Sequence, residues 1–231
     1  MSRGAPFLAA AFGAYLLYAF VSGRLYFYIH PVYIIPVVVT GMVLLAVAVL
    51  GGTAPAAATE RALPTRLALA LLALPVAVGV FLPARPLGVS MAAQRGVDAL
   101  PLGRIDDVPE FTVSTRPETY TIKDWVRAQQ ADPEPGRHAG KAVRVTGFVY
   151  RDDRLPRDWF VVARFVVQCC AVDAQPIGLP VRMAGGAVPE PGSWVTIAGT
   201  WDVAEVRGER RAIIVPTTVA PTERPDQPYL Y

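Results

Sequence analysis

Long stretches without any charged side chain dominate the first 85 residues. Asp, Glu, Lys and Arg are absent from residues 4–23, 25–59 and 67–84. A water-soluble domain rarely spaces its charges so far apart, because its exposed turns and helix faces carry polar side chains. A lipid bilayer is the environment in which such a sequence is stable. The sequence therefore predicts a membrane region at residues 1–85, followed by a domain in which charges recur regularly.

Each charge-free stretch coincides with an apolar run close to the roughly 20 residues that a membrane-crossing helix needs. Backbone N–H and C=O groups cannot bond to water inside a bilayer, so each run is expected to be helical. The predicted transmembrane helices are residues 5–21, 32–50 and 66–82. Tyr26, Phe27 and Tyr28 are typical of the headgroup boundary and indicate a short turn between the first two helices.

His30 is a candidate functional residue in this turn, because ionisable side chains near membrane segments are usually functional. Its place directly before Pro31, in the turn between two helices, favours a histidine hydrated among the lipid headgroups.

The basic residues do not decide how the membrane region is inserted. Arg3, Arg61 and Arg66 would lie on one side, and Arg24, Arg85 and Arg95 on the other. We expect a multi-pass protein of the cell membrane with a cytoplasmic N-terminus. Three crossings then place the C-terminal domain outside the cytoplasm.

The C-terminal part starts with a predicted juxtamembrane linker at residues 86–119, which is rich in Pro and Gly and has no sustained period. Residues 120–231 form the predicted soluble domain. Apolar side chains at Ile122, Trp125 and Val126 follow helical spacing, and Thr121 with Asp124 forms a capping-box variant. The pattern predicts a short helix that packs on the sheet that follows it.

From Lys141 onward the hydrophobic period changes to two, which is typical of strands. We expect five strands, at residues 141–151, 159–168, 179–183, 193–203 and 211–219. Gly147 and Gly199 fall within strands, where glycine marks a bend. The predicted fold is an all-β, OB-like, five-stranded small barrel preceded by one short helix, with a split β-sandwich as the competing architecture.

The chain has two cysteines, Cys169 and Cys170, and because they are adjacent they cannot staple distant segments together. If the second strand continues through them, one thiol enters the core and the other faces outward. If the chain turns instead, the pair and Asp173 can ligate zinc or another soft or borderline metal, with His138 as a further ligand.

Two other interpretations of the cysteine pair stay open. The pair can be purely structural. It can also be redox-active, which requires a nearby cation such as Arg164 or Arg182 to stabilise a thiolate.

Several function classes are disfavoured by the sequence. It contains no GxSxG, HExxH or phosphate-binding glycine loop, so we do not expect an enzyme or catalytic residues. The net charge is only +3 and the basic residues are scattered, so no nucleic-acid partner is expected.

Several segments together resemble the YcgQ-type family of bacterial membrane proteins. They are Thr146–Tyr150, Ala163–Phe165, Cys169–Ala174 and Pro228–Tyr231, with Tyr28–Pro31 and Pro83–Leu87 in the membrane region. The resemblance implies a non-enzymatic partner subunit of a multi-helix permease of the YcgR type, with a link to metal-ion supply. It transfers no catalytic residues.

The leading hypothesis is therefore a membrane-anchored accessory subunit of a permease that offers Cys169, Cys170 and Asp173 to a metal ion. The alternatives are a membrane-tethered thiol-redox protein and a purely structural docking module.

Overall fold

The computed structural model describes residues 4–51, 65–82, 84–97, 119–206 and 208–231. The chain divides into two compact units. The helical unit comprises Met1–Pro86 together with Cys169–Ala171, and the sheet unit comprises Leu87–Gln168 and Val172–Tyr231. N-terminal helices followed by an all-β domain are the coarse fold that the sequence predicts, and this prediction is confirmed.

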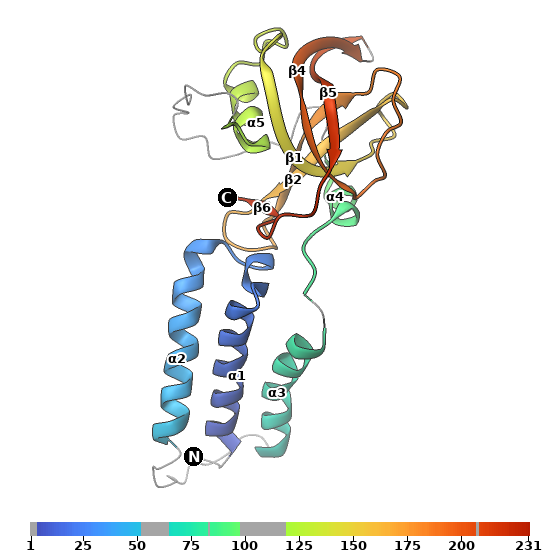
Figure 1. Cartoon of the computed structure of the whole chain (residues 1–231). Coiled ribbons are helices and arrows are strands. Elements are labelled where there is room, and N and C mark those ends of the chain that lie inside the picture. The colour runs from blue at the N-terminus through green and yellow to red at the C-terminus, as the bar shows by residue number, and fades with distance from the viewer. Residues whose placement is uncertain (1–3, 52–64, 83, 98–118, 207) are drawn as a thin grey trace. The chain divides into compact units, whose positions relative to one another are not determined.

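The helical unit contains three long helices among its described residues, and they lie side by side (Figure 1). They are α1 (Gly4–Val21), α2 (Ile34–Gly51) and α3 (Thr65–Phe81). Two short 3₁₀ turns, η1 (Arg24–Phe27) and η2 (Pro31–Tyr33), connect α1 to α2. The ring of His30 caps η2 by accepting a hydrogen bond from the backbone N–H of Val32.

Glycines allow these helices to approach closely. A Cβ added at Gly13 would lie 2.7 Å from the carbonyl oxygen of Gly41, so α1 and α2 meet backbone to backbone. On α3, Gly79 leaves room for the phenol of Tyr15 from α1. Small residues at contacts between helices are typical of bundles that pack within lipid.

One described helix is long and apolar enough to cross a membrane. It is the continuous stretch Pro31–Leu50, with a mean hydropathy of 2.6. The apolar part of α1, Pro6–Val21, is shorter. By length and composition, the described helices thus support one crossing, and they do not support the prediction of a multi-pass protein.

The described residues of the sheet unit form six strands. They are β1 (Ala142–Tyr150), β2 (Trp159–Val166), β3 (Gln175–Arg182), β4 (Trp194–Val206), β5 (Glu209–Pro221) and β6 (Tyr229–Leu230). Their order is β1-β4-β5-β3-β2-β6, and a further pairing of β1 with β2 closes the first five strands into a ring of hydrogen bonds. Most neighbours are antiparallel, whereas β3 with β5 and β2 with β6 are parallel.

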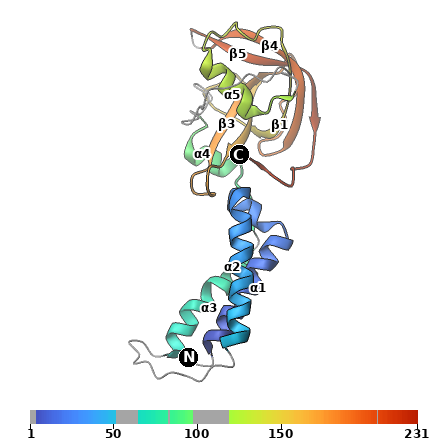
Figure 2. The same cartoon turned by 90° about the vertical axis from the view of Figure 1, so that its left-hand side faces the viewer.

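Both faces of β2 are buried, which explains its almost continuous apolar sequence. Phe160 and Val162 belong to a core with α5 (Ile122–Ala131), while Val161 and Phe165 belong to a second core. Figure 2 shows α5 against the sheet near β1 and β3. The predicted capping box of this helix, between Thr121 and Asp124, is present.

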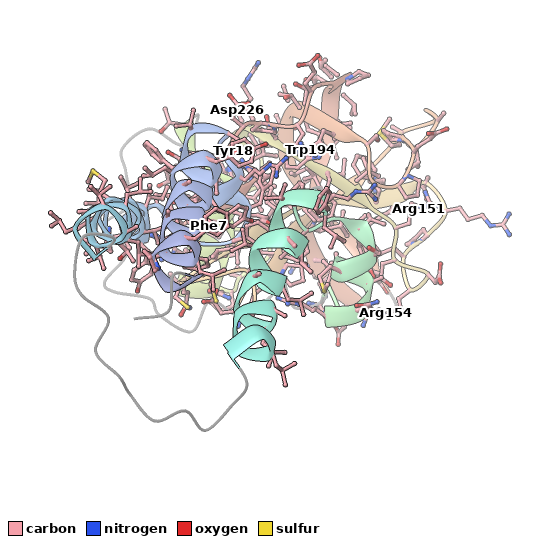
Figure 3. The ribbon with its side chains drawn as sticks, turned by 90° about the horizontal axis from the view of Figure 1, so that it is seen from below. Phe7, Tyr18, Arg151, Arg154, Trp194 and Asp226 are labelled. Carbon is pink, nitrogen blue, oxygen red and sulfur yellow. The ribbon has the colours of Figure 1, made fainter. Side chains whose placement is uncertain are left out.

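The stretch predicted to be a linker contains a further helix, α4 (Val89–Arg95). Ala92 and Val97 are fully buried in the second core. Arg154, which Figure 3 labels in the β1–β2 loop, donates a hydrogen bond to the carbonyl of Val97. Residues 87–97 are thus part of the sheet unit, and the rest of the predicted linker, residues 98–118, lies outside the described residues.

The C-terminal strand β6 was not predicted, and Arg164 holds the segment that leads into it. The guanidinium of Arg164 donates hydrogen bonds to the carbonyls of Gln227 and Pro228 and lies 5.6 Å from the ring centre of Trp194. Beyond β2, the N–H of Val167 donates to the carbonyl of Leu230. These bonds hold the C-terminal segment against the end of β2.

Gly199 permits a close approach of β4 and β5, at a shift in their register. A Cβ at this position would overlap the carbonyl of Val215, so Gly199→Ala should lower the free energy of unfolding by about 1–3 kcal/mol. All four tryptophans lie in the sheet unit, so their fluorescence reports its unfolding in the full chain.

The matched control is Gly136→Ala, where the added methyl makes only ordinary van der Waals contacts. Its effect should stay within about 0.5 kcal/mol. Equal stabilities of the two variants would contradict the predicted close approach.

Candidate metal centre

The two cysteines lie in the loop that connects β2 to β3. We expected β2 to continue through Gln168, but it ends at Val166, where its pairing with β3 also ends. Farther along, the N–H of Gln168 donates to Oδ1 of Asp173 at 2.9 Å and closes the loop. The strand does not continue through the cysteines, so the condition under which one thiol would enter the core is not met. Both residues carry thiols, with Cys169 exposed and Cys170 partly exposed.

Backbone hydrogen bonds within the helical unit hold the cysteine pair. The N–H of His30 donates to the carbonyl of Cys169 at 2.9 Å, and the N–H of Ala171 donates to the carbonyl of Tyr28 at 2.8 Å. These bonds flank an antiparallel bridge between Ile29 and Cys170. The segment Cys169–Ala171 thus has a fixed backbone on the turn between α1 and α2. We had not predicted this pairing.

Three predicted ligands come together in the loop. One ligand atom from each of Cys169, Cys170 and Asp173 lies within 4.8 Å of the other two. Ligand atoms on one tetrahedral zinc ion lie about 3.3–3.8 Å apart, so small side-chain rotations would suffice to close the group on a metal. Two thiolates and a carboxylate also repel one another, and a cation relieves this repulsion. The arrangement therefore suits a borderline cation.

The DUF1980 C-terminal domain is the family whose model matches this chain. It matches residues 121–231, which include α5, all six strands and the cysteine loop. The name of that family assigns no activity, ligand or partner. No curated protein matches the chain in sequence. The resemblance to YcgQ-type subunits and the permease partner stay predictions.

His138, the predicted further ligand, is not one of the residues in this group. It lies in the turn before β1, where its buried ring packs against Trp125 with 5.5 Å between ring centres. Its Nδ1 is 3.2 Å from Nζ of Lys141. Burial lowers the pKa of His138, and the charge of Lys141 acts in the same direction. The histidine is thus held neutral in the aromatic core of the sheet unit.

The two arginines that the redox interpretation requires are bound elsewhere. Arg164 donates to backbone carbonyls of the C-terminal segment. Arg182 forms an ion pair with Asp202 at 3.7 Å. Both arginines thus have partners other than the cysteines. The carboxylate of Asp173 has an oxygen within 4.8 Å of the cysteine sulfurs.

The lowered pKa of His138 predicts a pH-dependent stability of the sheet unit. An unfolded histidine takes up its proton near pH 6.5, above the pKa in the folded state. Stability contributed by neutral His138 is therefore complete above about pH 6.5 and is lost as the pH falls further. Tryptophan-monitored thermal unfolding between about pH 7.5 and 5.5 should show this loss in the natural chain and a smaller loss in His138→Gln. Identical pH dependence in both would contradict the assignment.

Proposed function

We propose that this protein is a membrane-anchored accessory subunit of a permease, whose cysteine loop binds a soft or borderline metal ion such as zinc. The observation that carries the proposal is the group formed by Cys169, Cys170 and Asp173, with ligand atoms within 4.8 Å of one another. Two thiolates and a carboxylate are a ligand set that zinc accepts.

We further propose that α1 and α3 lie in the bilayer beside α2. Large apolar side chains are exposed along these helices, with Phe7 74%, Val21 83% and Phe81 84% exposed. The side chains of α2 likewise project outward around the helix (Figure 3). Apolar surface of this extent is unfavourable in water and calls for lipid or another protein. Such a region spans the membrane several times.

An accessory role suits these helices better than a transport path of their own. Gly13 and Gly41 bring α1 and α2 into backbone contact, which leaves no room for a solute between them. The exposed apolar faces of the same helices can pack against the helices of a larger partner. The resemblance to YcgQ-type subunits supports a permease as that partner.

The soluble part is proposed to be an OB-like barrel. The ring of five strands, with one parallel pairing between β3 and β5 and a covering helix, supports this assignment. In such a barrel the loops between strands carry ligand groups on a rigid support. The cysteine loop between β2 and β3 is one of these loops.

Metal content tests the ligand assignment. The full chain purified in detergent and equilibrated with zinc should retain about one ion per chain, as one three-residue group provides. The double variant Cys169→Ser, Cys170→Ser should retain almost none, because a hydroxyl replaces each thiolate. Asp173→Asn should weaken binding about tenfold or more, by analogy with losses of metal-site partners.

Asp153→Asn is the matched control, since Asp153 lies in the β1–β2 loop and outside the ligand group. It should bind zinc like the natural chain. If the natural chain and the double cysteine variant retained the same amount of zinc per chain, the proposed metal site would be contradicted.

Co-purification tests the partner. When a YcgR-type permease is co-expressed, the full chain should elute with it from detergent. The double cysteine variant should still co-elute, because apolar helix faces carry the proposed contact. A chain that consistently elutes alone would refute the accessory role and leave the metal site standing.

A further inference from the structure

The turn between α1 and α2 places a histidine opposite the cysteine pair. In an antiparallel bridge with Ile29 opposite Cys170, the next pair is His30 opposite Cys169. The hydrogen bond from the N–H of His30 to the carbonyl of Cys169 confirms this register. Side chains of opposed residues point to the same face, with Cβ atoms about 4.5–5.5 Å apart. His30 and Cys169 therefore share one face of the bridge, although 139 positions separate them in the sequence.

We propose that His30 is the fourth protein ligand of the metal bound by Cys169, Cys170 and Asp173. This inference rests on the proposed metal-binding function and adds the residue that completes its site. Two sulfurs, one oxygen and one imidazole nitrogen make a four-ligand set for a tetrahedral zinc ion. The set replaces His138, whose ring is buried against Trp125 in the sheet unit.

Binding of the metal has a defined consequence for the turn. The Nδ1 of His30 accepts a hydrogen bond from the N–H of Val32 at 3.2 Å, and the ring lies edge-on to Tyr33. His30 is outside the group of three ligands, so its ring must rotate to reach the metal. If Nδ1 binds the metal, its lone pair is no longer available to the N–H of Val32. If Nε2 binds the metal, a neutral ring carries its proton on Nδ1, which then cannot accept that hydrogen bond. In both cases the N–H of Val32 loses this acceptor.

The site is thereby linked to a membrane helix. Val32 lies in η2, which leads directly into α2, and Pro31–Leu50 is the stretch long enough to cross a bilayer. A metal held by His30 and the two cysteines, all within the helical unit, lies next to the start of that helix. Metal occupancy then changes the N-terminal cap of the segment that precedes α2.

Cobalt(II) is the probe for this fourth ligand, because its visible absorption reports ligand type and geometry. The full chain in detergent is titrated with Co²⁺, and thiolate charge-transfer and d–d bands are followed. His30→Asn keeps a side chain that can cap η2 but removes the imidazole. It should bind Co²⁺ at least about tenfold more weakly, with altered d–d bands. His138→Asn is the matched control and should bind like the natural chain.

A second variant guards against loss of binding through misfolding. His30→Cys offers a third thiolate at the same position, so the charge-transfer absorbance per bound Co²⁺ should increase. Unchanged affinity and spectra in both His30 variants, with binding lost in the double cysteine variant, would overturn this inference and leave the proposed function intact. Absence of thiolate bands in the natural chain would overturn the proposed function itself.

Discussion

Two backbone hydrogen bonds hold the cysteine pair on the turn between α1 and α2, and the candidate site depends on them. His30 donates to Cys169 and Ala171 donates to Tyr28, on either side of the bridge between Ile29 and Cys170. Adjacent thiols on an unrestrained loop would sample many separations, and ordering them around an ion would cost conformational entropy. Because the backbone is already fixed, a metal needs to order little more than side chains. The fixed backbone therefore lowers the entropic cost of binding a metal through these side chains.

Within the sheet unit, the chain around the end of β2 is also held by hydrogen bonds. Arg164 holds the segment before β6, and Leu230 of β6 bonds to Val167, directly beyond the end of β2. Burial lowers the pKa of Arg164, but the guanidinium stays charged and its hydrogen bonds to carbonyls offset the loss of water. The cysteine loop therefore begins at a backbone position that is itself bonded. A redox role requires a cation beside the thiols. The guanidinium of Arg164 instead donates its hydrogen bonds to backbone carbonyls of the C-terminal segment.

Local sequence patterns predicted most helices and strands. They did not predict which segments pair when these are far apart in the sequence. Alternation of apolar residues gives the strands, and Thr121 with Asp124 gives the start of α5, because these signals act over a few residues. The helix α4 escaped prediction because its seven residues are too few to establish a period. The pairing of β2 with Leu230 and the approach of His30 to Cys169 both join residues that are far apart in the sequence. No local pattern reports such partners.

The positions of nearby charged side chains, which the sequence does not give, also bear on the candidate roles of the cysteines. From the sequence, Asp173 was a neighbour of uncertain position, and Arg164 and Arg182 were equally available as thiolate-stabilising cations. The fold places the carboxylate within 4.8 Å of the thiols and engages both arginines in other contacts. A thiolate nucleophile requires positive charge around it, whereas a metal site requires negative ligands that a cation then neutralises. A cation held by two thiolates and a carboxylate would offset their mutual repulsion, and this is the physical basis of the proposed metal site.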